Sequence, residues 1–344
     1  MNSYERMRAL VEGRPVDRAG VCGWFHMPLV DHNITDFVNA TIAVTDYCGW
    51  DFVKLMTNGN FMPEAYDADL TPSRDPHEWC ATFHRYPIRD MEDLKKLKVL
   101  DAKSGSLHRE VLVTKALCGH YRDTVPVIAT IFSPLTSLQE MMSSLNPTGI
   151  KRFIRENRQE LHNALSIVTQ TIQNYLDELI EAGIDGVFFA NQYSMSTIIT
   201  PEEFDEFCKP YDLEILNYIK DRTWFNMLHV HGDANLMMDR FLDYPVQAIN
   251  WENVPSKICD RQRTTVKMVR QMTGKLLICG IDQTADFYNK DNDREAVKAL
   301  LKERYDAVAK EVGGNGFVFA PGCSMPLDVE PYLFTLLKEV AEEA

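Results

Sequence analysis

The chain has 344 residues, of which 45% are hydrophobic, and a formal net charge of -14. This length and apolar content allow one large domain with a substantial core, and the acidic balance argues against nucleic-acid binding, which requires a basic surface. No apolar run approaches the roughly 18 residues that a membrane helix needs. The eight cysteines are scattered without paired spacing, so we expect reduced thiols in a cytoplasmic protein.

The predicted elements begin with a helix near the N-terminus, capped by Ser3. Short apolar runs then recur along the chain, each followed by a polar or small-residue turn and a stretch with helical periodicity. Most runs are continuous rather than alternating, which is typical of parallel strands covered on both faces. The eight strands predicted in this way are residues 20–24, 52–56, 125–132, 186–190, 225–231, 248–251, 275–281 and 317–320.

Amphipathic helices are predicted between the strands. Residues 158–182 carry an apolar stripe and end at Gly183, which suits a left-handed cap. Thr200 predicts a helix start because Glu203 completes a capping box, and residues 293–311 predict a further helix. Strands that alternate with helices form βαβ units, so we expect a single (β/α)8 TIM-type barrel spanning 1–344 with an N-terminal helical extension. No glycine-rich nucleotide-binding motif follows any strand.

Two histidines and a distant cysteine form the strongest candidate site. His229 and His231 lie two residues apart at the end of a predicted strand, so both imidazoles project from one face. Cys323 directly follows the last predicted strand. Two imidazoles and one thiolate suit zinc, and three protein ligands would leave a position open for substrate. The alternative for each residue is a packed or hydrogen-bonded side chain at a strand end.

Other polar side chains follow the predicted strands, and the strand ends of a barrel meet at the face where active sites are built. Glu252 and Asp282 are catalytic candidates, either as a fourth ligand or as a partner that orients an imidazole; a helix cap or a strand-end hydrogen bond is the alternative. Asp233 is expected to cap a helix over 235–244. The candidates for substrate binding, or for packed rim positions, are Trp24, His26, Asn191 and Tyr193.

The chain resembles the uroporphyrinogen decarboxylase superfamily over nearly its full length. The resemblance implies a barrel of that family's kind and a homodimer, since relatives commonly dimerise. Each motif alone is weak, but together they are specific. The segments that carry the resemblance are residues 3–6 with 15–18, 49–54, Pro134-Leu135-Thr136, 200–204 with Pro210-Tyr211, Gly280-Ile281-Asp282 and 320–323.

Decarboxylases of this superfamily resemble one another in residues that this chain lacks. Residues 22–28 contain no arginine to grip porphyrin carboxylates, and residues 58–60 contain no aspartate. The position of the family's tyrosine is nearer Glu140, and Cys323 replaces a histidine in the last motif. Because a porphyrin substrate with many carboxylates needs several cations in its pocket, uroporphyrinogen is not the expected substrate.

The other branch of the superfamily comprises methyltransferases that work with corrinoid proteins, and its zinc site has the pattern H-x-C with a distant cysteine. This chain is similar in His229 and Cys323 but carries His231 in place of the middle cysteine. The resemblance implies a zinc-dependent methyltransferase that acts on a small molecule, with methylcobalamin or another corrinoid on a partner protein. The exchange of cysteine for histidine makes the zinc a stronger Lewis acid, which argues against coenzyme M as the thiol substrate.

Two other functions remain open. One is a metal-free decarboxylase or lyase for a smaller acid, with His229 or His231 as the general acid. The other is a barrel without catalytic activity that serves as a binding subunit, against which the three potential ligands at one barrel face argue. Metal content separates the methyltransferase from both.

Overall fold

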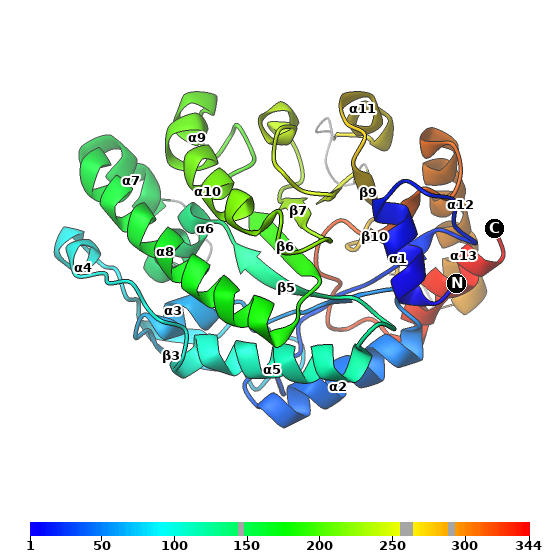
Figure 1. Ribbon diagram of the computed structural model, residues 1–344, viewed down its shortest axis with the longest axis horizontal. Coiled ribbons are helices and arrows are strands. Elements are labelled where there is room, and N and C mark those ends of the chain that lie inside the picture. Colours follow the sequence, from blue (N-terminus) through cyan, green and yellow to red (C-terminus); the bar gives the residue numbers. More distant parts are fainter. Residues whose placement is uncertain (144–147, 255–263, 288–292) are drawn as a thin grey trace.

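Eight parallel strands form one curled sheet surrounded by helices (Figure 1), in a computed structural model that describes residues 1–143, 148–254, 264–287 and 293–344. The order of the strands in the sheet is β1-β10-β9-β8-β7-β6-β5-β2, which follows the chain around the barrel. All eight predicted strands are confirmed, and so is the α/β fold of TIM-barrel type. The strands are β1 (Gly20–Val21), β2 (Val53–Lys54), β5 (Val127–Phe132), β6 (Gly186–Asn191), β7 (Met227–Val230), β8 (Ala248–Trp251), β9 (Leu276–Ile281) and β10 (Phe317–Pro321).

A buried carboxylate joins β1 and β2, the two strands at the ends of the sheet order. Asp51 precedes β2, and its backbone N–H donates to Val21 O of β1 at 2.8 Å, while its Oδ2 accepts from Val21 N at 2.8 Å. The guanidinium groups of Arg6 and Arg18 donate to the same carboxylate at 2.7 Å and 2.6 Å. These charge-assisted bonds satisfy a carboxylate that has no contact with solvent.

The N-terminal helix α1 (Ser3–Val11) brings Arg6 to this carboxylate. The predicted cap at Ser3 is wrong: Asn2 is the N-cap, since its side chain accepts from Glu5 N and the Glu5 carboxylate accepts from Asn2 N. The hydroxyl of Ser3 instead donates to Asp51. Ser3 is therefore the first residue of the helix and helps to close the barrel.

Alternate side chains of each strand point into the barrel, as the period of two requires. Phe52, Phe188 and Met227 belong to one buried apolar cluster with inward residues of the other strands, whereas their sequence neighbours pack against the outer helices. Two positions beyond Phe52 and Met227 lie Lys54 and His229. The inward face therefore changes from apolar to polar toward the carboxyl ends of the strands.

Helices cover the outside of the sheet (Figure 1). The predicted helix over 158–182 is confirmed, with Gly183 as its left-handed cap at φ 99°, and so are the capping box of Thr200 and the helix that begins after Asp293. The helices after α1 are α2 (Ile34–Cys48), α3 (Phe61–Ala65), α4 (Met91–Lys95), α5 (Gly105–Tyr121), α6 (Pro134–Met142), α7 (Thr148–Glu156), α8 (Arg158–Ala182), α9 (Pro201–Phe207), α10 (Lys209–Ile219), α11 (Val266–Met272), α12 (Arg294–Val312) and α13 (Leu336–Glu342).

Two segments differ from the prediction. The expected helix over 235–244 is wrong, because Asn235 has a left-handed backbone with φ 54°, and only the short 3-10 helix η1 (Met238–Phe241) forms there. Asp233 therefore caps no such helix. A small antiparallel hairpin, β3 (Asp69–Thr71) with β4 (Thr82–Arg85), was not predicted, since its strands are short and largely exposed. A second 3-10 helix, η2 (Pro331–Thr335), precedes α13.

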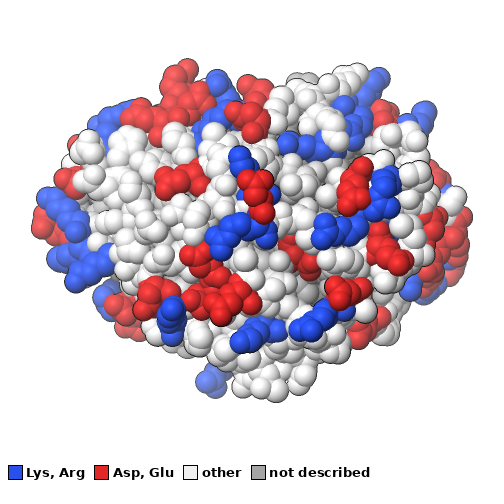
Figure 2. All heavy atoms as spheres, viewed as in Figure 1, with Lys and Arg blue, Asp and Glu red and all other residues white. Residues whose placement is uncertain are grey.

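Acidic and basic side chains are interspersed on the face shown in Figure 2, and no large basic surface gathers there. This distribution agrees with the net charge of -14. None of the helices in the described ranges combines the length and the apolar character that crossing a bilayer requires.

Candidate functional site

Three potential metal ligands converge at the carboxyl end of the barrel strands. His229 lies in β7, His231 follows that strand, and Cys323 follows β10. One potential ligand atom from each residue lies within 4.8 Å of those of the other two. His229 Nε2 is 3.3 Å from His231 Nδ1, and Cys323 Sγ is 3.8 Å from the same Nδ1. The fold therefore brings together side chains that are 92 residues apart in the chain.

A close approach of two chain segments positions Cys323. A Cβ atom at Gly322 would lie 2.7 Å from Glu252 Cα, closer than real Cβ contacts allow. Only glycine therefore lets the segment that follows β10 pack against the segment that follows β8. This packing also places Glu252 beside the ligand set.

The spacing of the three donor atoms fits tetrahedral zinc. With Zn–N bonds of about 2.0–2.1 Å and a Zn–S bond of about 2.3 Å, donor atoms in a tetrahedral site lie about 3.3 to 3.6 Å apart. Two of the three separations here are 3.3 Å and 3.8 Å, and the third, between His229 and Cys323, is within 4.8 Å. Two imidazoles and a thiolate are borderline-soft donors, the set that zinc prefers. Three side chains leave one coordination position free.

Asn250 orients His229. The two residues are paired in register across β8 and β7, so their side chains are neighbours on the inward face. Asn250 Nδ2 donates to Ile278 O at 2.8 Å and to Pro321 O at 3.0 Å, which leaves its Oδ1, at 2.7 Å, to accept from His229 Nδ1. The Nε2 atom of His229 therefore carries the lone pair and faces the other two ligands, as a metal ligand must.

Cys323 and His231 stabilise each other's charged forms. Burial raises the pKa of the Cys323 thiol, but hydrogen bonds with His229 and His231 and the positive charge of His231 outweigh that effect and hold the pKa well below its ordinary value. Burial likewise lowers the pKa of His231, yet the hydrogen bond and charge of Cys323, with the charges of Glu252 and Glu140, raise it to about 9. The cysteine is thus in the thiolate form, which binds metal, whereas His231 becomes a metal ligand only when it releases its proton.

A cavity of about 140 Å³ lies beside the three potential ligands, and Trp24, Trp79, Phe132 and Phe188 contribute aromatic rings to its walls. The rings of His26 and Trp79 stack at a centroid distance of 4.4 Å, and the ring of Phe188 stacks on that of His229 at 5.0 Å. Besides His229, His231 and Cys323, the lining residues are Trp24, His26, Lys54, Met56, Thr57, Gly59, Trp79, Thr130, Phe132, Glu140, Phe188, Ala190, Gln192 and Ser324.

Two buried ionisable groups in this lining were not predicted as site residues. Lys54 ends β2 and is 6% exposed, and burial lowers the pKa of its amine to about 7. Glu140 lies in α6, and burial raises the pKa of its carboxyl to about 8, although the charge of His231 and a hydrogen bond with Gln192 oppose the change. Perturbed pKa values of this kind concentrate at functional sites.

The structure separates the four candidates for substrate binding. Trp24 and His26 line the cavity, whereas Asn191 and Tyr193 do not. The side chain of Asn191 is turned toward α10, where its Nδ2 donates to Asp212 at 2.7 Å, and its Oδ1 accepts from Tyr193 N. Both residues are therefore part of the packing behind the cavity.

The two acidic candidates also differ in position. The charge of Glu252 acts on His231, so this carboxylate lies within electrostatic reach of the ligand set. Asp282 lies outside the group of potential ligands, and its Oδ1 accepts from Thr284 N at 2.9 Å and from Thr284 Oγ1 at 2.6 Å. Asp282 thus stabilises the turn after β9, which is the strand-end role considered above.

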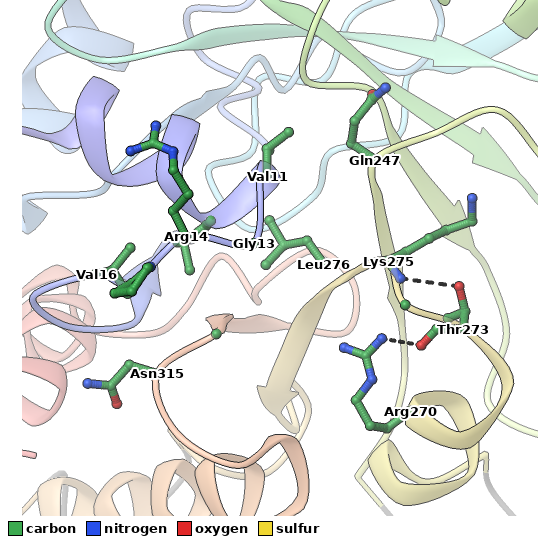
Figure 3. Close-up of a pocket in the computed structure, with 14 residues that line it drawn as sticks. Val11, Gly13, Arg14, Val16, Gln247, Arg270, Thr273, Lys275, Leu276 and Asn315 are labelled. Carbon is green, nitrogen blue, oxygen red and sulfur yellow. Dashed lines mark hydrogen bonds between the residues drawn. The ribbon is translucent and has the colours of Figure 1, made fainter.

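A larger cavity of about 850 Å³ lies at the opposite end of the barrel (Figure 3). Several of its lining residues directly precede strands, among them Gln247, Lys275 and Gly316. Active sites of such barrels lie at the carboxyl ends of the strands, not at this end. No group of three potential metal ligands in the described residues lies there, so the smaller cavity is the candidate site.

Comparison with known proteins agrees with the fold. The family model for uroporphyrinogen decarboxylase (URO-D) matches residues 7–344. A uroporphyrinogen decarboxylase of Campylobacter jejuni is 28% identical over 259 residues, which cover 74% of this chain and 71% of the relative. A methyltransferase from Methanosarcina mazei superposes with a TM-score of 0.79 at 18% identity, covering 100% of this chain and 99% of that chain. A B12-independent methionine synthase from Shewanella superposes with a TM-score of 0.56 at 12% identity, covering 94% and 96%.

Proposed function

Because the chain belongs to the uroporphyrinogen decarboxylase family, we propose that it is the kind of family member that transfers methyl groups: a zinc-dependent methyltransferase acting between a corrinoid protein and a small molecule. The observation that carries the proposal is the convergence of His229, His231 and Cys323, which all line the same cavity. The similarity in fold to a methyltransferase from Methanosarcina mazei supports this choice of reaction.

Zinc bound by these three side chains would keep one position for substrate and lower the pKa of a thiol or water bound there. Asn250 holds His229 in the tautomer that presents Nε2 to the site. The negative charge of Glu252 acts on His231, so Glu252 could serve either as a fourth metal ligand or as a partner that orients the imidazole. The aromatic side chains of Trp24 and Phe188 exclude water from the substrate.

A proton donor also faces the cavity. Glu140 is buried, and because the pKa of its carboxyl is raised to about 8, it carries a proton at neutral pH. A neutral carboxylic acid can protonate a leaving group or hold a hydrogen bond to it. We assign Glu140 this proton-holding role in the proposed reaction.

The second candidate is a metal-free decarboxylase for a small acid, since the named relatives are uroporphyrinogen decarboxylases. Uroporphyrinogen itself fits this cavity poorly. Among the described residues, the cavity lining contains Lys54 but no arginine, and the cavity has a volume of only about 140 Å³. Several carboxylates would need several cations there. In the decarboxylase, His229 or His231 would act as the general acid.

Metal content tests the proposal. Elemental analysis after purification without chelators should find about one zinc per chain in the wild type. His231→Ala should lose it, whereas His84→Ala, which changes a histidine of the exposed β3–β4 hairpin, should retain it. The zinc-loaded wild type should also demethylate methylcobalamin in the presence of a thiol panel, and His231→Ala should not. A wild type that binds no zinc even after reconstitution would contradict the proposal and favour the decarboxylase.

A further inference from the structure

Lys54 is a buried cation that the proposed zinc site does not use. It is the last residue of β2, points into the barrel and is 6% exposed. Its Nζ lies 4.2 Å from the ring centroid of Phe188 and 2.7 Å from Met56 Sδ. Within the described part of the chain, no carboxylate forms an ion pair with it, and the nearby negative charge that favours its ammonium form is that of Cys323. A buried ammonium without an oxygen partner is costly, so packing alone gives no reason for a lysine here.

Arg270 and Lys275, two cations that line the larger cavity (Figure 3), both donate hydrogen bonds to backbone oxygens. Lys275 Nζ donates to Tyr244 O at 2.8 Å and to Val246 O at 3.0 Å, and Arg270 donates to Thr273 O. Each of these cations has an oxygen acceptor, as structural cations require. Lys54 instead contacts an aromatic ring and a thioether, which are weak partners, and it lines the smaller cavity.

The shape of the smaller cavity limits what can meet Lys54. Its volume is about 140 Å³, and a cavity of about 150 Å³ in another protein is known to hold benzene. Trp24, Phe132 and Phe188 supply flat apolar walls, and Trp24 contacts Phe188 edge to face at 5.7 Å. These walls suit one small planar ring, and the amine of Lys54 suits one negative charge on that ring.

We propose that Lys54 anchors the carboxylate of a small aromatic acid whose ring lies against Trp24 and Phe188. The acid's other end then faces His229, His231 and Cys323, which line the same cavity. Under the proposed function, on which this assignment of a role rests, the substrate is an aromatic carboxylate with an O-methyl group. Its oxygen–methyl bond would break as cobalt(I) of the partner corrinoid takes the methyl group, and the aromatic oxygen would keep the bonding electrons. Lys54 is therefore a specificity-determining residue, and it binds the acid through charge without requiring a metal.

Calorimetric titration of the metal-free protein tests the proposal, with benzoate as the probe and benzamide as its neutral counterpart. Wild type should bind benzoate at least about 10-fold more tightly than benzamide, because only benzoate pairs with the amine. Lys54→Met should lose that 10-fold preference while keeping its affinity for benzamide, since the aromatic walls are unchanged. Lys275→Met removes a lysine at the far end of the barrel and should keep the preference; circular dichroism checks that each variant is folded.

Two results would overturn the proposal: equal affinity of the wild type for benzoate and benzamide, or an unchanged preference in Lys54→Met. A titration repeated after zinc loading separates this proposal from the metal site. If benzoate binds only when zinc is present, and binds equally to Lys54→Met, the carboxylate binds the metal and Lys54 is not its anchor. If benzoate binding depends on Lys54 in a chain that takes up no zinc, the anchor stands and the zinc-dependent methyltransferase fails.

Discussion

Replacement of Lys54 by methionine should stabilise the metal-free protein at neutral pH. The amine is almost fully buried, and no carboxylate of the described residues pairs with it. Burial, only partly opposed by the charges of Cys323 and Cys22, lowers its pKa from 10.5 to about 7. Methionine has a similar length and no charge, and it fits a wall that already contains Met56.

The size of the effect follows from the pKa. Each pH unit between the folded and unfolded pKa values corresponds to about 1.4 kcal/mol, so the buried ammonium costs at most about 5 kcal/mol of folding free energy. That cost is fully present below pH 7 and disappears as the pH rises through 10.5, because above 10.5 the unfolded chain has also lost the proton. Water that enters the cavity reduces the cost, so we expect a gain of about 2 to 4 kcal/mol at pH 7.

Thermal unfolding of the two proteins at pH 7 and pH 10.5 measures the difference. An unfolding entropy of about 2.1 cal/mol/K per residue makes 1 kcal/mol about 1.4 °C for a chain of this length, so Lys54→Met should unfold about 3 to 6 °C higher at pH 7. The gap should fall to about 1 °C at pH 10.5. Lys338→Met, a surface control in α13, should differ from the wild type by less than about 1 °C at pH 7. A Lys54→Met protein that is no more stable than the wild type at pH 7 would refute the reasoning.

Three further predictions concern other buried polar groups. Asn250→Leu removes the acceptor that orients His229, so zinc affinity measured by chelator competition should fall about 10- to 100-fold; unchanged affinity would exclude the positioning role. Burial raises the pKa of Asp212 from 3.8 to about 7, so the wild type loses stability as the pH rises from 4 through 7. The unfolding free energy of Asp212→Asn, relative to that of the wild type, should therefore increase by at least about 2 kcal/mol as the pH rises from 5 to 8. A difference between the two proteins that does not change with pH would contradict this. Asp51→Asn leaves Arg6 and Arg18 without a buried counter-charge and should lose about 3 to 5 kcal/mol in urea unfolding; a loss below about 1 kcal/mol would show that the network contributes little.

The strands and the metal-ligand geometry were predictable because both follow from periodicity. The continuous apolar runs identify strands buried on both faces, and the spacing of His229 and His231 puts both side chains near one strand end. Cys323 follows from the rule that barrel strands end at a common face. The predicted helix over 235–244 is wrong: Asn235 has a left-handed backbone, which asparagine adopts more readily than most residues, and only residues 238–241 form a 3-10 helix.

Lys54 and Glu140 escaped prediction for a different physical reason. A lone lysine at the end of an apolar strand, and a lone glutamate in a short helix, are usually solvated. Their burial depends on what covers them: every residue of α6 from Pro134 to Met141 is buried, so this helix has no solvated face on which Glu140 could lie. Asn191 was predicted to bind substrate, but it lies behind the cavity, where it donates to Asp212 of α10. The sequence does not reveal that this helix contacts β6.

The distribution of satisfied and unsatisfied polar groups distinguishes the two ends of the barrel. At the closure of β1 and β2, Asp51 is fully buried but accepts from two arginines and a backbone N–H, so its burial serves the fold. At the carboxyl ends, the buried Lys54 lacks an oxygen partner, and the Nδ1 atom of the half-buried His26 is inaccessible to solvent and has no hydrogen bond. Natural proteins retain buried polar groups without hydrogen-bond partners where function requires them, although such groups destabilise the fold. A ligand with a negative group and a second polar group could pair with Lys54 and His26 Nδ1 at once, which links the lysine and the aromatic wall to one bound molecule rather than to the stability of the barrel.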